Sequence, residues 1–150
     1  MFHIHKSLKN KRMKNRDALV DLGLLVLRVG IGIIFIFHGF PKLMGGVETW
    51  TQIGSTMSLI GINFAPTFWG FMAAFAEAVG GVLIVFGLMH RPVALMLVFT
   101  MIVALLMHVT AGDPFGIYSN ALKALVVFIA LTITGPGRYS VDYRYFRAIA

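Results

Sequence analysis

The sequence predicts an all-α membrane protein, a four-transmembrane-helix bundle with a short amphipathic helix in the outer loop between spans one and two. Three observations predict this class. Hydrophobic residues make up 58% of the 150 residues and charged residues only 13%, about half of the charged share usual in a soluble domain. The apolar residues gather into four runs, each near the length of about 20 residues that a membrane span requires. Basic residues crowd the ends of these runs.

The first span is predicted over 18–40, after a polar and basic segment at 1–17. A cleaved signal peptide is the alternative there. The run is too long for the apolar core of such a peptide, contains Arg28, and is not followed by a short small-residue cleavage site, so an uncleaved span is favoured. The second span is predicted over 66–88, because the missing N–H of Pro66 has no partner to lose in the first turn of a helix.

The third and fourth spans are predicted over 93–109 and 117–134. The third follows the break His90-Arg91-Pro92. The fourth ends before Gly135-Pro136-Gly137, which cannot continue a helix. The chain is therefore divided into a basic cytoplasmic tail, a membrane domain and a second cytoplasmic tail, at 1–17, 18–134 and 135–150.

The loop between the first two spans is long, and its apolar residues recur at helical spacing. They are Trp50, Ile53, Met57 and Ile60, with polar residues between them. This spacing predicts a short amphipathic helix on the outer surface of the bundle. Periodicity alone leaves open an irregular loop anchored by the same apolar side chains.

The distribution of charge predicts the orientation of the bundle. A net charge of +7 could suggest nucleic acid, but ten of the thirteen Lys and Arg residues lie in the segments 1–17, 89–92 and 135–150. All three segments face the cytoplasm if the N-terminus does, as the positive-inside rule requires. The sequence therefore predicts that both termini are cytoplasmic and that the partner of the basic residues is the lipid bilayer, with no nucleic acid bound.

Three stretches together resemble the DoxX family of small bacterial membrane proteins. They are LRVGIGIIFIFHGFPKLMGG at 27–46, AEAVGGVLIVFGLMHRP at 76–92 and GPGRYSVD at 135–142. The resemblance covers about 19–142. It implies a bacterial plasma (inner) membrane location and a quinone-linked redox or oxidative-stress role, since the family is similar to a subunit of a thiosulfate:quinone oxidoreductase. No catalytic residue is carried over from the family.

Two ionisable residues lie well inside the first two spans. Arg28 is about nine residues from the inner end of the first, and Glu77 about eleven residues from the outer end of the second. Charges inside a span are costly, so we expect them to form a direct ion pair at matched depth. The pair is either a staple that fixes helix order or part of a ligand cavity or proton path.

A second group of basic residues is predicted near the outer surface. His38 and Lys42 end the first span, His108 ends the third, and Lys123 is expected to face the bundle interior from the fourth. Such groups could donate to the carbonyl oxygens of a quinone, or they could bond to interfacial water and snorkel. Candidate catalytic residues are Glu77, His38 and His108, and candidate ligand-binding residues are Arg28, His38, Lys42, Glu77, His108 and Lys123.

Other cofactors have less support in the sequence. The chain has no cysteine, which excludes a thiol nucleophile or Cys-ligated metal of its own. Two histidines on different spans could ligate haem, but nothing else favours it. No His-x-x-x-His or Glu-x-x-His pattern suggests a metal site.

Three classes of function stay open at this point. One is the membrane subunit of a redox complex, with a quinone site in the outer half of the bundle. The others are a non-catalytic anchor or assembly factor, and a small-molecule carrier or resistance protein. A separate soluble or membrane redox protein and a second copy of the chain are the candidate protein partners.

Overall fold

A computed structural model describes residues 2–145, and it describes side chains from residue 13 onward. No strand occurs in this range, which confirms the all-α prediction. The elements are α1 (Phe2–Met44), α2 (Gly46–Ser55), the 3-10 helix η1 (Thr56–Ile60), α3 (Pro66–Phe86), α4 (His90–Thr110), α5 (Phe115–Thr134) and α6 (Val141–Tyr145).

Four of these helices are long and apolar enough to cross a membrane. They are Met13–Met44 of α1 together with α3, α4 and α5. The four-span bundle is therefore confirmed, and so is a short helix between spans one and two, formed by α2 and η1. α4 begins at His90, before the predicted bound, because Pro92 then lies in the first turn, where a missing N–H costs no hydrogen bond.

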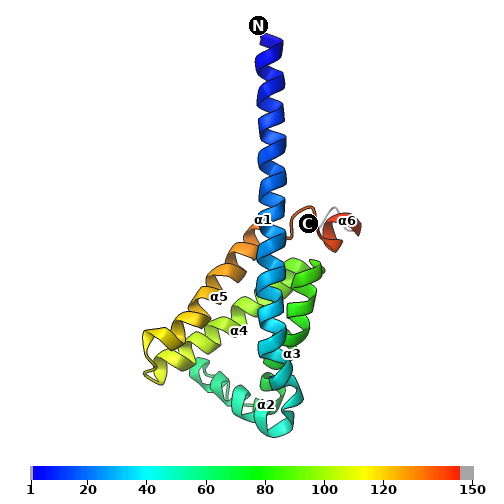
Figure 1. The fold of residues 1–150 in the computed structure, drawn as a ribbon. Helices are drawn as coiled ribbons and strands as arrows, with labels where there is room; N and C mark the ends of the chain where they lie inside the picture. Colours follow the sequence, from blue (N-terminus) through cyan, green and yellow to red (C-terminus); the bar gives the residue numbers. More distant parts are fainter. Residues whose placement is uncertain (1, 146–150) are drawn as a thin grey trace.

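The spans form two helix pairs, α1 with α3 and α4 with α5 (Figure 1). Glycines bring α1 and α3 into backbone contact: a Cβ added at Gly81 would lie 2.8 Å from the carbonyl oxygen of Gly32. The rings of Phe35 on α1 and Phe128 on α5 pack edge-to-face, with their centroids 4.7 Å apart. This contact connects the α1–α3 pair to the α4–α5 pair. Many large apolar side chains point outward, as expected where lipid is the solvent.

The helix α2 crosses one end of the bundle, which we name the α2 end (Figure 1). Its backbone touches α3, because a Cβ on Gly70 would collide with the carbonyl oxygen of Trp50. The indole Nε1 of Trp50 donates to the carbonyl oxygen of Lys42 at 3.0 Å. These contacts hold α2 across the ends of α1 and α3.

The residues around α6 close the opposite end, which we name the α6 end. The Asp142 carboxylate accepts hydrogen bonds from the backbone N–H groups of Met89 and His90, at 2.9 and 2.8 Å. The Asp142 N–H donates to the Gly87 carbonyl, and the Arg138 N–H donates to Asp21 of α1. The C-terminal segment therefore ties α1 to the turn between α3 and α4.

Candidate functional site

A cavity of about 550 Å³ lies between α3 and α4 at the α2 end. The two helices are in contact at the α6 end, where a Cβ on Gly80 would meet Val93, and they diverge toward α2 (Figure 1). The residues that line the cavity come from α1, α2, η1, α3 and α4. They are Lys42, Ile53, Gly54, Thr56, Met57, Phe68, Trp69, Met72, Ala73, Ala76, Glu77, Met96, Phe99, Thr100, Val103, Ala104, Met107 and His108.

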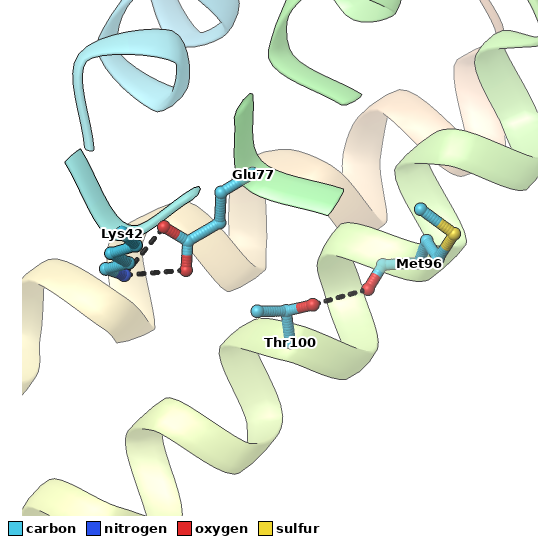
Figure 2. Close-up of polar contacts among 4 residues, drawn as sticks. All are labelled: Lys42, Glu77, Met96 and Thr100. Carbon is cyan, nitrogen blue, oxygen red and sulfur yellow. Dashed lines mark hydrogen bonds and ion pairs between the residues drawn. The ribbon is translucent and has the colours of Figure 1, made fainter. Parts of the chain in front are cut away.

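Two of the lining residues, Lys42 and Glu77, form an ion pair. The Lys42 Nζ lies 2.8 and 2.6 Å from the two carboxylate oxygens of Glu77 (Figure 2). The Glu77 side chain is only 5% exposed, whereas that of Lys42 is 39% exposed. Gly39 makes the pair possible, because its missing side chain lets α1 touch the α3 backbone at Glu77 and Ala78. Removal of the ammonium group would leave the buried carboxylate without a counter-charge.

The predicted ion pair between Arg28 and Glu77 is wrong. The glycine contacts set the register of α1 against α3 so that Gly39 is level with Glu77 and Arg28 with Gly87. The ten residues between Glu77 and Gly87 correspond to about 15 Å along a helix. Arg28 thus lies at the α6 end and does not line the cavity.

Arg28 forms a second buried polar cluster there with His90. Arg28 is 1% exposed and His90 is fully buried. Within the described residues, Nε and Nη1 of Arg28 and both ring nitrogens of His90 have no hydrogen-bond partner. The nearby Asp142 carboxylate balances the charge of Arg28, although its oxygens already accept from the start of α4.

His108 contacts the cavity from the last turn of α4, and its partner is a residue that sequence reasoning did not assign to it. The His108 Nδ1 lies 2.6 Å from Oδ2 of Asp113, in the turn that follows α4. Gly112, with a φ of +75°, allows the chain to fold back, and the Asp113 N–H donates to the His108 carbonyl. The sequence did contain a signal for this contact: Asp113 directly follows Gly112, and a glycine just after a helix lets the chain turn back toward the last helical turn.

The structure does not bring His38 and Lys123 to the cavity. Both are exposed, and neither contributes to the lining. The expectation that Lys123 faces the bundle interior is wrong, because α5 packs through Ala121, Ala124, Phe128 and Leu131. Two residues after Ala121, the helix has turned by about 200°, so Lys123 points away from α4.

The rest of the lining is mostly apolar and includes Met57, Met72, Met96 and Met107. Methionine side chains adapt their shape to irregular ligands. The Thr100 hydroxyl is satisfied within its own helix, since it donates to the Met96 carbonyl at 3.0 Å (Figure 2). The indole Nε1 of Trp69, by contrast, has no hydrogen-bond partner among the described residues. Within the same range, no cluster of His, Asp or Glu could hold a metal ion.

Comparison with known proteins identifies relatives of this architecture. The family model described as DoxX matches residues 23–110. The chain is 33% identical over 127 residues to "Putative oxidoreductase CatD" of Bacillus subtilis (strain 168), covering 85% of this chain and 90% of that protein. It is 35% identical over 129 residues to "Inner membrane protein YqjF" of Escherichia coli (strain K12), covering 83% and 92%.

A third relative is "Inner membrane protein YphA" of the same Escherichia coli strain, 32% identical over 133 residues, with 81% of this chain and 89% of that protein covered. No solved structure matches the chain. The matched residues include all of α3 and all of α4, and therefore both long walls of the cavity.

Proposed function

This chain belongs to the DoxX family, and from that premise we propose that it is the quinone-binding membrane subunit of a redox or oxidative-stress complex. The cavity at the α2 end carries the proposal. Its volume of about 550 Å³ lies within the usual range of roughly 300–1,000 Å³ for small-ligand sites. Apolar walls with a few polar groups suit an amphipathic ring compound with a lipid tail.

The polar groups match the head group of a quinone, which has two carbonyl oxygens that accept hydrogen bonds. Lys42 has three N–H donors, and the two contacts with Glu77 leave the third for a ligand. His108 is held through Nδ1, so its Nε2 is free to face a ligand and is a second donor when the ring carries a proton on both nitrogens. The two residues belong to α1 and α4, so the donors reach the cavity from separate helices.

Access from the membrane supports a lipid-soluble ligand. Phe68 of α3 and Met96 and Phe99 of α4 line the cavity, and all three are also exposed on the outside of the bundle. The cavity therefore opens sideways between the two helices toward the acyl chains. At its far end, the fully buried Ile84, Leu97 and Phe128 fill the bundle, an arrangement that favours a binding site over a route across the membrane.

The proposal includes an orientation in the membrane. Most of the basic residues outside the spans lie at the α6 end or in the segment that precedes α1's apolar part. The positive-inside rule then puts both termini in the cytoplasm and the α2 end outside. The names of YphA and YqjF support the bacterial inner membrane as the location.

The chemistry requires a second protein or a diffusible reductant. Reduction of a quinone consumes two electrons and two protons. Glu77 and His108 can exchange protons, but the chain has no cysteine to supply electrons. An external donor must therefore supply the electrons, and the resemblance to the DoxX family implies a donor of the thiol or sulfur-anion class.

Binding can be tested with the two tryptophans of the chain as reporters. Trp69 lines the cavity and Trp50 does not. In the Trp50→Phe variant, decylubiquinone should quench the remaining Trp69 fluorescence in a saturable manner. In the matched Trp69→Phe variant, the remaining Trp50 should show much weaker quenching. Both variants are titrated in detergent micelles and in lipid nanodiscs.

The composition of the purified protein provides the second part of the test. We expect mass spectrometry of lipids extracted from mildly solubilised wild-type protein to detect a quinone. No retained quinone together with equal, unsaturable quenching in both variants would contradict the proposal. Such a result would favour a non-catalytic anchor or assembly role.

A further inference from the structure

The His108–Asp113 pair has an arrangement that goes beyond binding. His108 lines the cavity, yet its side chain is 28% exposed, and the Asp113 side chain is 32% exposed. The pair therefore stands between the cavity and the surface at the α2 end. Lys42 and Glu77, the other ionisable residues of the lining, form an ion pair with each other.

The contact with Asp113 determines which nitrogen of His108 can react. An ionised carboxylate only accepts hydrogen bonds, so the Nδ1 of His108 must be the donor in the 2.6 Å contact. In neutral His108 the lone pair is then on Nε2. This nitrogen has no hydrogen bond to any other described residue, so it can take up a proton and give it to a ligand.

The position of Asp113 is itself fixed by the backbone. Its N–H donates to the His108 carbonyl at 3.0 Å, and the neighbouring Gly112 N–H donates to Val109 at 3.1 Å. Two contacts, one through the side chain and one through the backbone, therefore join Asp113 to the same histidine. This arrangement holds the ring in one orientation and one tautomer.

We propose that the His108–Asp113 dyad exchanges protons between the quinone in the cavity and water at the α2 end, with Asp113 as the positioning residue. The inference rests on the proposed function. When a dithiol reduces the quinone, the dithiol loses two electrons and two protons and becomes a disulfide. The quinone gains two electrons from it. One proton from His108 Nε2 and one proton from the Lys42–Glu77 pair convert the two carbonyl oxygens to hydroxyl groups. Water then returns one proton to His108 and one to the Lys42–Glu77 pair.

Stopped-flow reduction of protein-bound decylubiquinone by dithiothreitol tests the dyad. The ring of this quinone is fully substituted, so thiol addition does not compete. Relative to wild type, Asp113→Asn should slow the formation of bound quinol by about 100-fold, the low end of the range of general acid–base effects. The Kd for quinone, from Trp69 quenching in the Trp50→Phe background, should change less than twofold.

Three further variants separate positioning from a structural role. Asp113→Glu should restore most of the rate, because a carboxylate can again accept from Nδ1. His108→Gln should slow the reaction as Asp113→Asn does, and the double variant should be no slower than His108→Gln alone, since the two residues act as a unit. An Asp113→Asn rate equal to wild type, or additive effects, would overturn the inference. Failure of wild-type protein to bind quinone would instead overturn the proposed function.

Discussion

Replacing Lys42 with methionine is expected to lower the free energy of unfolding by about 3 kcal/mol, the low end of the range for a broken buried ion pair. The substitution keeps much of the side-chain volume but removes the ammonium that lies 2.6 and 2.8 Å from Glu77. Glu77, at 5% exposure, then holds a carboxylate without a counter-charge. The low end applies because Lys42 is itself 39% exposed. Reversible unfolding in mixed detergent and SDS micelles measures the change.

Two control variants separate loss of charge pairing from loss of packing. Lys42→Arg keeps a cation and should lose less than half as much stability. In the double variant Lys42→Met with Glu77→Gln, the uncompensated charge is gone, so much of the lost stability should return. Equal stability of Lys42→Met and wild type would mean that the ion pair does not hold α1 against α3.

Gly39→Ala is expected to cost about 2–3 kcal/mol, toward the upper part of the usual range for overpacking. The new methyl group would lie 2.7 Å from the Glu77 Cβ and would collide with the backbone nitrogen of Ala78. Backbone atoms cannot move aside as a flexible side chain can, so α1 and α3 must separate. The separation should also weaken quinone binding, because Lys42 is only three residues from Gly39.

Gly30→Ala on the same helix is the matched control. Among the described residues, no atom lies within 4 Å of a Cβ at Gly30, and alanine favours helix more than glycine does by about 1 kcal/mol. This variant should be as stable as wild type or slightly more stable in the same SDS titration. Similar losses for both glycine variants would contradict the close contact of α1 with α3.

The fold was predictable from composition and the spacing of apolar residues. Four long apolar runs and the helical spacing of Trp50, Ile53 and Met57 predict the spans and the short helix α2 with its extension η1. The limits of the helices were harder to predict, because proline does not always end a helix. α1 continues through Pro41 to Met44, and α4 begins two residues before Pro92.

The depth of the charges could not be predicted because it depends on helix register. Counting from the ends of apolar runs placed Arg28 level with Glu77. In the structure, the contacts of Gly32 and Gly39 fix the register, and Lys42 is the residue that reaches Glu77. Sequence periodicity shows that a helix has a small-residue face, but it does not show which small residue of the neighbouring helix it meets.

The cavity was only partly predictable for a similar reason. Lys42, Glu77 and His108 stood out because ionisable side chains are rare in membrane spans. Apolar lining residues such as Met96 and Val103 could not be separated from lipid-facing ones, because both environments are apolar. The outward direction of Lys123 was missed because alanine forms the packing face of α5, and alanine is a weak sequence signal for burial.

Filling the cavity tests the central claim most directly. Ala73 lines the cavity, whereas Ala130 is exposed on α5, so Ala73→Phe and Ala130→Phe add the same side chain inside and outside the site. The measurement is the Kd for decylubiquinone from Trp69 quenching in the Trp50→Phe background, with melting temperature as the check on folding. We predict that Ala73→Phe raises the Kd at least tenfold, or about 1.4 kcal/mol, while Ala130→Phe leaves it unchanged. An unchanged Kd in folded Ala73→Phe protein would contradict quinone binding in this cavity.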